Sequence, residues 1–434
     1  MKRYLFCTAI AAVALTSCSN DDFLGEVPGN TPSAVTAKEI SFSGEAGKIS
    51  RAGETTGKDA ATALNNKFIV FGTKTSNNTA TTVYDHYNVE YKTPDLGWEY
   101  KGLAFNSLNE KSGTAGETKQ SLKYWDYSAN QYDFVAFSFG NATQGTGEDH
   151  VEASRVNQTN FTYTLKGKID DLVKCYIADR VTVKQTGFNK KVSFTFHPLG
   201  TKVNIGLYEV IEGYSVKDVK FYSSADDNNP TDIPTLFASS ATIPTGTEKE
   251  VITVSFDDNK NVKTEWQAAT STASPARPLV TRGDDASAAT NKSTTITFDN
   301  LSKVGAEGLE GGSTDYLGRD KATGSISKPT NPKAILPCGN VGELTLKVDY
   351  TLVSTDGSGE TIKVTGATAK VANTYTNWTA NKSFTYIFKI SQKTNGTTGG
   401  TGATEGLYPI EFDTVIATEG TGGNTEDIEL KSND

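Results

Sequence analysis

The sequence has little of the residue types on which many active sites depend. Of its 434 residues, one is methionine, four are cysteine and three are histidine, namely His86, His150 and His197. The histidines have neither HExxH nor HxH spacing, no two cysteines form a CxxC pair, and no GxSxG motif occurs. No acid–base constellation stands out elsewhere. The sequence therefore predicts a protein that is not an enzyme and that needs no cofactor or metal.

Basic character and long apolar runs are also missing. The formal net charge of −9 makes nucleic acid a poor partner, because phosphates would be repelled. The apolar run from Tyr4 to Ala14 is too short to cross a bilayer, which takes about 20 apolar residues. It follows Met1-Lys2-Arg3, as the apolar region of a signal peptide follows its charged start.

The end of this run predicts a lipoprotein. Leu15-Thr16-Ser17-Cys18 places two small residues before a cysteine, the pattern that a lipoprotein signal peptidase requires. We expect residues 1–17 to be removed and Cys18 to carry acyl chains that hold the protein at a membrane. The alternative is an ordinary cleaved signal in which the cysteine has no role.

Sustained helical periodicity is absent from every window of 12 or more residues. What the sequence has instead is abundant Thr, Gly, Tyr and Phe in short alternating or apolar runs, bounded by Gly, Asn, Asp or Pro. An all-β protein with two tandem β-sandwich domains is therefore expected. The predicted strands lie in residues 67–72, 132–139, 161–165, 191–196, 202–210, 216–222, 250–256, 293–298, 343–353 and 383–390.

Composition also divides the chain. We expect a tether and a first strand in residues 18–51, with Ile40 and Phe42 on one face of that strand. The domains are predicted at 52–212 and 213–392, and the polar stretch 266–295 is interpreted as a mobile loop. A glycine-rich linker begins at Lys393, and residues 393–434 also hold a strand-like piece, 407–417. The nearly apolar face of that piece consists of Tyr408, Ile410, Phe412, Thr414 and Ile416.

A few short motifs are ambiguous. Asp226–Asp232 crowds oxygen ligands into a turn, but it lacks the order of a calcium loop and reads equally as a solvated turn. Arg282-Gly283-Asp284 spells an integrin-type tripeptide that a chain rich in Gly and Asp produces by chance. Cys175 and Cys338 remain candidates for a disulfide in an oxidising compartment.

Several segments, in order, resemble the fimbrillin family, which builds the type V pili of Bacteroidota-like bacteria. Val192–Leu207 resembles its paired-strand signature, with His197 at the strand end and Lys202 opening the next strand. The other segments are Tyr124–Phe139, Leu336–Leu352 and Asn377–Ile390. Ser19-Asn20-Asp21-Asp22 resembles the acidic tract that directs lipoproteins of such bacteria to the outer face of the outer membrane. The resemblance implies transthyretin-like sandwiches and a non-enzymatic surface protein.

The resemblance also implies a route of assembly. Fimbrillin precursors are cut after an arginine by a trypsin-like protease, which removes the lipid and the first strand. Arg51-Ala52 is the predicted bond, in a Gly- and Ser-rich stretch, with Arg277 and Arg282 as rivals. The vacated edge then accepts a strand from another subunit, for which 407–417 is the candidate donor. Ile410-Glu411-Phe412 repeats the Ile-x-Phe spacing of Ile40-Ser41-Phe42, a match short enough to arise by chance.

Two functions stay open at this point. The first is a pilus subunit (stem, tip or anchor) whose partners are other subunits, an Arg-specific protease and a receptor. The second is a permanently anchored outer-membrane lipoprotein that binds a glycan or a host protein. Trp98, Trp125, Trp266 and Trp378 are possible sugar-stacking residues, although we expect most of them in the core.

Overall fold

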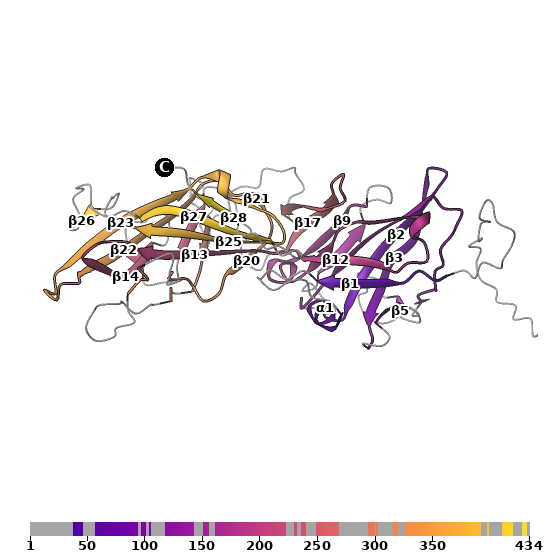
Figure 1. Cartoon of the computed structure of the whole chain (residues 1–434). Coiled ribbons are helices and arrows are strands. Elements are labelled where there is room, and N and C mark those ends of the chain that lie inside the picture. The colour runs from indigo at the N-terminus through magenta and orange to yellow at the C-terminus, as the bar shows by residue number, and fades with distance from the viewer. Residues whose placement is uncertain are drawn as a thin grey trace, which may run out of the picture.

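The structure is a computed structural model. It describes residues 38–46, 57–93, 97–100, 104–105, 118–142, 151–155, 161–222, 230–231, 236–239, 249–268, 294–299, 301–302, 316–319, 326–391, 397–398, 410–419 and 428–431. Figure 1 shows two β-rich lobes arranged end to end. The expected all-β class is confirmed, and each strand range predicted above coincides with a strand or overlaps one.

The N-terminal lobe is built around one large, mostly antiparallel sheet. Its order is β1-β12-β10-β7-β2-β3-β4, and β11 also pairs with β7. The strands are β1 (Phe42–Ala46), β2 (Lys67–Ser76), β3 (Thr79–Tyr91), β4 (Trp98–Glu99), β7 (Gln131–Ser138), β10 (Tyr176–Ala178), β11 (Val181–Lys184) and β12 (Val192–Pro198).

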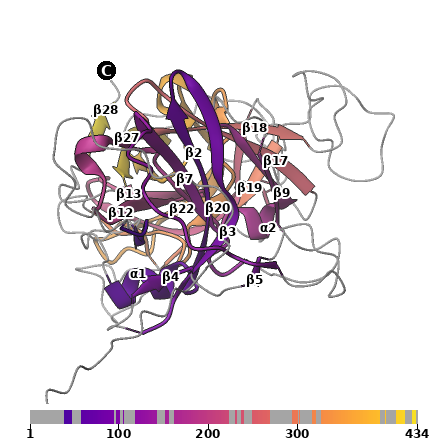
Figure 2. The same ribbon diagram turned by 90° about the vertical axis from the view of Figure 1, so that its right-hand side faces the viewer.

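Both faces of this sheet are covered, which explains the apolar runs of β2 and β7. Phe68 and Val70 belong to one buried cluster, and Ile69 and Phe71 belong to another on the opposite face. The short helix α1 (Gly57–Ala63) contributes to the first cluster, and a second sheet covers the other face. Figure 2 shows α1 and that second sheet on opposite sides of β2. Strands buried on both faces lose the alternation of half-exposed strands.

The second sheet has the order β18-β17-β9-β8. It joins β8 (Glu152–Arg155) and β9 (Tyr163–Lys168) to a hairpin from much later in the chain, β17 (Lys249–Phe256) and β18 (Val262–Ala268). Ile252 of β17 pairs with Leu165 of β9, and both are buried. Residues 249–268 thus lie in the N-terminal lobe, although the boundary predicted near Glu212 assigns them to the second domain.

The C-terminal lobe is a sandwich of two sheets around one core. The first has the order β20-β13-β25-β27-β28, with β13 (Thr201–Glu209), β20 (Lys333–Ile335), β25 (Lys382–Ile390), β27 (Ile410–Glu419) and β28 (Ile428–Lys431). The facing sheet comprises β14 (Tyr214–Tyr222), β15 (Pro230–Thr231), β16 (Leu236–Ser239), β19 (Thr294–Thr297), β22 (Leu344–Ser354), β23 (Thr361–Val371) and β26 (Thr397–Thr398). Alternate residues of β22 are buried, as expected for one core-facing side.

Smaller elements complete the fold. They are the pairs β5 (Ala104–Phe105) with β6 (Thr118–Lys119) and β21 (Gly339–Asn340) with β24 (Asn377–Trp378), the helix α2 (Ile169–Leu172) and the 3₁₀ turns η1 (Gln185–Gly187) and η2 (Asn373–Tyr375). Among the described residues, no helix is long and apolar enough to cross a membrane.

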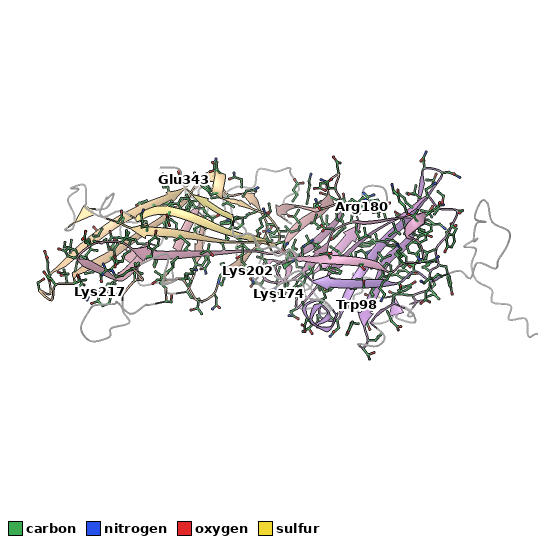
Figure 3. The ribbon with its side chains drawn as sticks, viewed as in Figure 1. Trp98, Lys174, Arg180, Lys202, Lys217 and Glu343 are labelled. Atoms are coloured by element: carbon green, nitrogen blue, oxygen red, sulfur yellow. The ribbon has the colours of Figure 1, made fainter. Side chains whose placement is uncertain are left out.

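Strands β12 and β13 connect the two lobes. The sequence pattern over Val192–Leu207 suggests strands paired with each other, but β12 pairs with β1 and β10, whereas β13 pairs with β20 and β25. A Cβ at Gly200 would lie 2.8 Å from the Val173 carbonyl oxygen, so the chain passes between the lobes against a neighbouring backbone. Figure 3 shows Lys174 and Lys202 at this junction.

The carboxyl group of Glu209 on β13 is fully buried. Its Oε1 lies 2.9 Å from Nε of Arg319, and its Oε2 accepts a hydrogen bond from the Ile211 N–H at 2.8 Å. Burial raises the pKa of Glu209 to about 7, although the Ile211 N–H and the Arg319 charge both act to lower it. The folded protein therefore holds this proton more tightly than the unfolded chain does.

We predict that the free energy of unfolding decreases as the pH rises from the ordinary glutamate range through about 7. The stabilisation that comes from the proton on Glu209 is fully present below the pKa of this group in the unfolded chain. It is lost as the pH rises above the pKa in the folded protein. In Glu209→Gln, which cannot ionise, this part of the pH dependence should disappear. Urea unfolding at pH 5 and pH 8 measures this pH dependence, and Glu212→Gln, at an exposed position, is the control. The prediction is contradicted if the free energy of unfolding changes by the same amount between these pH values in the parent protein and both variants.

Candidate functional site

The segment from Lys38 to Ala46 starts the described part of the chain and lies in the core of the N-terminal lobe. The side chains of Ile40 and Phe42 are 0% exposed. They share a buried cluster with residues of α1, β2, β3, β7 and β12. The pair that the sequence predicts for the removable first strand is thus part of the main core. We call the surroundings of this segment the first-strand site.

The segment is hydrogen-bonded along both of its edges, by different parts of its length. Phe42–Ala46 run parallel to Val192–Phe196 of β12. The residues just before them pair antiparallel with a separate segment: the Ile40 N–H donates to the Lys123 carbonyl at 2.9 Å, and the Trp125 N–H donates to the Lys38 carbonyl at 3.2 Å. The first strand therefore joins β12 to the segment around Lys123.

Aromatic rings surround Phe42. Ring centroids lie 5.2 Å away for Tyr84, 5.6 Å for Phe134, 5.7 Å for Tyr100 and 5.9 Å for Phe194. The contacts with Tyr84 and Phe134 are edge-to-face, a geometry that adds to the benefit of burying the rings. These rings come from β3, β7 and β12 and from Tyr100, so Phe42 connects strands that are not neighbours in the sheet.

Tyr100 positions the backbone of the first strand. Its hydroxyl donates to the Ile40 carbonyl at 3.0 Å and accepts from the Lys123 N–H at 3.2 Å. Burial raises the pKa of Tyr100 to about 12, so the hydroxyl keeps its proton at neutral pH. Sequence reasoning missed Tyr100, because a lone tyrosine outside the predicted strands carries no signal of this contact.

Gly44 marks the narrowest part of the first-strand site. A Cβ placed on Gly44 would lie 3.1 Å from Cε2 of Phe196, 3.2 Å from Cε1 of Phe68 and 3.4 Å from Cδ1 of Leu64. The inward-facing residues of this strand are thus large at positions 40 and 42 and small at position 44. Any strand that replaces β1 in the same register must meet that pattern.

The predicted donor strand lies within the chain's own C-terminal sheet. β27 pairs antiparallel with β25 over nine residue pairs, from Ile410 opposite Ile390 to Glu419 opposite Lys382. Phe412 packs against the C-terminal core, with ring centroids 5.5 Å from Tyr375 and 6.0 Å from Phe388. Asp413 accepts a hydrogen bond from the Tyr208 hydroxyl at 3.0 Å. Ile410, Thr414 and Ile416 lie on the same strand, and Tyr408 lies outside the described residues.

A further strand follows that the sequence analysis did not identify. β28 spans Ile428–Lys431 and pairs with β27 over four residue pairs at the edge of the sheet. The signal was present, because Ile428 and Leu430 alternate with Glu429 and Lys431. This strand is short and lies near a stretch rich in glycine and acidic residues, so the alternation was not recognised as a strand.

His197 forms a polar contact between the lobes. Its Nε2 lies 2.8 Å from Oδ2 of Asp179, and its Nδ1 lies 3.3 Å from Nδ2 of Asn381, which belongs to the C-terminal lobe. These contacts give His197 a structural role at the junction of the lobes. A cavity of about 600 Å³ opens beside it, lined in part by Val262, Lys263, Thr379 and Asn381. Two buried oxygens there, Oγ1 of Thr379 and Oδ1 of Asn381, have no hydrogen-bond partner among the described residues.

The remaining predicted sites fall into two groups. Cys18, Arg51, Ala52, Arg277, Arg282 and most of Asp226–Asp232 lie outside the described residues. Within the described part of the chain, Cys175 and Cys338 are not bonded to each other, and no group of His, Cys, Asp and Glu side chains is arranged to hold a metal ion. Trp98, Trp125 and Trp378 are buried, which confirms their expected place in the core.

No family model and no curated protein matches the sequence. Among solved structures, the chain is similar to a fimbrial protein from Bacteroides vulgatus, at 15% identity and a TM-score of 0.44, covering 83% of this chain and 99% of that one. It is also similar to a candidate adhesin from Bacteroides thetaiotaomicron, at 8% identity and a TM-score of 0.35, covering 92% and 100%. A candidate cell adhesion protein from Parabacteroides distasonis gives 10% identity, a TM-score of 0.35 and coverage of 88% and 96%.

The first strand should contribute strongly to the stability of the N-terminal lobe. We predict that Phe42→Ala lowers the free energy of unfolding by about 3–5 kcal/mol, because it empties a fully buried aromatic position. Urea unfolding measures the loss, and hydrogen exchange of the β7 and β12 amides assigns it to this lobe.

Ser43→Ala is the matched control on the opposite face of the same strand. The Ser43 hydroxyl lies 2.9 Å from the Ser193 hydroxyl in an exposed contact, so its loss should cost no more than about 1 kcal/mol. Similar losses in the two variants would mean that the first strand is not part of the cooperative core.

Proposed function

We propose that this protein is a non-catalytic subunit of a type V pilus, exported as a lipoprotein through Cys18 and released by cleavage after Arg51. It then polymerises by exchange of the first strand for a strand from another copy. The observation that carries the proposal is the complete burial of Ile40 and Phe42 in the N-terminal core. Residues 47–56 connect this strand to α1, and the predicted bond, Arg51-Ala52, lies among them.

Loss of the first strand would leave a site suited to another strand. It would expose the rings of Tyr84, Tyr100, Phe134 and Phe194 and two rows of backbone groups, one on β12 and one on residues 123–125. Unpaired strand edges bind other strands readily. Main-chain hydrogen bonds would supply affinity, and the ring-lined positions of Ile40 and Phe42 would select the incoming side chains.

Cleavage alone would not empty the site. After the cut, the strand still buries two large apolar side chains, each worth about 1.5–3 kcal/mol, and keeps its hydrogen bonds on both edges. The lipid on Cys18 would remain with the cleaved strand and hold it at the outer membrane while the rest of the subunit moves into the pilus. We expect release of the strand, rather than cleavage, to limit the rate of assembly.

One observation favours the second function. The cavity beside His197 has polar lining and two buried oxygens without partners, Oγ1 of Thr379 and Oδ1 of Asn381. Hydroxyl groups of a glycan would satisfy them. In that case the protein is a permanently anchored outer-membrane lipoprotein that binds a glycan or a host protein and keeps its first strand.

The test uses residues 19–434, without the acyl anchor, treated with an Arg-specific protease. We predict a single cut before Ala52, followed by growth into ladders or filaments. Intact mass, N-terminal sequencing and native size over time measure the two steps. Arg51→Gln should stay an intact monomer, whereas Arg277→Gln and Arg282→Gln should behave like the parent chain.

The other outcomes separate the candidates. Resistance at Arg51 would overturn the cleavage step and favour the permanently anchored lipoprotein. A cut at Arg51 that leaves a lasting monomer would contradict self-polymerisation and indicate a tip subunit or one that needs a different partner. Growth of the Arg51→Gln variant into polymers would show that removal of the first strand is not the trigger.

A further inference from the structure

We propose that the strand entering the vacated first-strand site is residues 428–432 of another copy, and not residues 410–414. Ile428 takes the place of Ile40, Leu430 that of Phe42 and Ser432 that of Gly44. The inference rests on the proposed strand exchange and specifies the segment, its direction and its register. The strand runs parallel to β12, as β1 does.

The pattern of residues 428–432 matches the requirements of the site. The inward positions read Ile, Leu and Ser, with the smallest residue where Gly44 lies against Phe68 and Phe196. The outward positions, Glu429 and Lys431, are polar, as are Ser41 and Ser43 in β1. The short strand thus places apolar side chains in the core and polar ones toward solvent, as alternation requires.

Residues 410–414, the alternative segment, do not fit the site at the position of Gly44. With Ile410 and Phe412 in the places of Ile40 and Phe42, Thr414 falls at the position of Gly44. A Cβ there already lies 3.1–3.2 Å from two phenylalanine rings, and threonine adds two further heavy atoms to that carbon. The next outward position would be Val415, where β1 has Glu45. Overpacking of this kind forces side chains off their preferred rotamers and destabilises the packed site.

The two segments also differ in what their departure costs the donor. Withdrawing β27 would break a ladder of nine residue pairs with β25, the contacts of Phe412 with Tyr375 and Phe388, and the Tyr208–Asp413 hydrogen bond. Withdrawing β28 breaks a ladder of four pairs with β27 at the sheet edge. The donor lobe therefore loses four backbone pairs when β28 leaves, whereas it loses nine pairs and part of its core when β27 leaves.

The chain supplies a linker for this movement. Eight residues, 420–427, separate β27 from β28, and three of them are glycine. Fully extended, eight residues span roughly 26–29 Å. β27 can thus stay in its own sheet while residues 428–432 reach a neighbouring subunit.

The native first strand fits the site better than the proposed replacement. Leu430 is smaller than Phe42, and Ser432 still brings a Cβ against the rings that Gly44 avoids. The exchange therefore cannot proceed while β1 remains covalently attached to its own lobe. This difference explains why a protease would be needed before assembly.

Disulfide trapping between copies tests the register. Ser43 lies opposite Ser193 on β12, with their hydroxyl oxygens 2.9 Å apart, and Ser193 is exposed. In the proposed register Lys431 takes the position of Ser43, so Lys431→Cys with Ser193→Cys should form disulfides between subunits. In the alternative register Asp413 takes that position, and Asp413→Cys with Ser193→Cys is the matched comparison. Each double variant of residues 19–434 is cut at Arg51, oxidised and run on a non-reducing gel.

We expect the 431/193 pair to give a ladder of covalent multimers after cleavage and none before it, and the 413/193 pair to give no ladder. Peptide mass spectrometry of the gel bands identifies the linked residues. The single variants Ser193→Cys and Lys431→Cys control for the native Cys175, which is buried, and Cys338, which is half-buried.

Each remaining outcome contradicts the inference. A ladder from the 413/193 pair alone would overturn it and leave strand exchange intact, with β27 as the donor. If polymers form but neither the 431/193 pair nor the 413/193 pair is linked by a disulfide, both proposed registers are contradicted. If the cut parent chain forms no polymers, the proposed strand exchange fails, and this inference fails with it.

Discussion

The N-terminal lobe depends on the packing of one side chain, Phe42, among rings from strands that are not adjacent. It contacts Tyr84 on β3, Phe134 on β7 and Phe194 on β12, and it belongs to a segment separated from the last of these by about 150 residues. Contacts of such sequence separation cost loop-closure entropy, which this cluster must offset. The core of the lobe is therefore completed by residues 38–46, the first segment that the structure describes.

This arrangement makes the first strand essential to the N-terminal lobe. It is essential because the central sheet is buried on both faces, so an empty first-strand site would expose rings and two strand edges together. The proposed function treats it as replaceable, and the strand is indeed short, lies at the edge of the sheet and is joined to α1 by the single stretch 47–56. Under that proposal, the site beneath the strand would stay covered until one peptide bond is broken.

The two lobes use a similar pairing with different consequences. In each, the first strand runs parallel to a strand from much later in the chain: β1 to β12, and β13 to β25. In the C-terminal lobe β13 is continuous with the connection to β12, and β27 completes the far side of β25. In the structure β28 pairs with β27 at the edge of the same sheet. Figure 1 shows β27 and β28 near β25 within the C-terminal lobe.

The sequence by itself determined the β class, the ranges of many strands although not those of β3, β23 and β28, and the shared face of Ile40 and Phe42, because alternation and turn residues are local signals. It also indicated a strand near Phe412. It did not predict that β12 and β13 belong to different sheets, that residues 249–268 return to the first lobe, or that Tyr100 and Gly44 shape the first-strand site. Those features depend on which distant strands pair, and pairing is decided by packing across the whole core rather than by any local pattern. For the same reason, only the tertiary structure showed that β27 pairs with β25 over nine residue pairs and packs Phe412 against the core, whereas β28 pairs with β27 over four at the sheet edge.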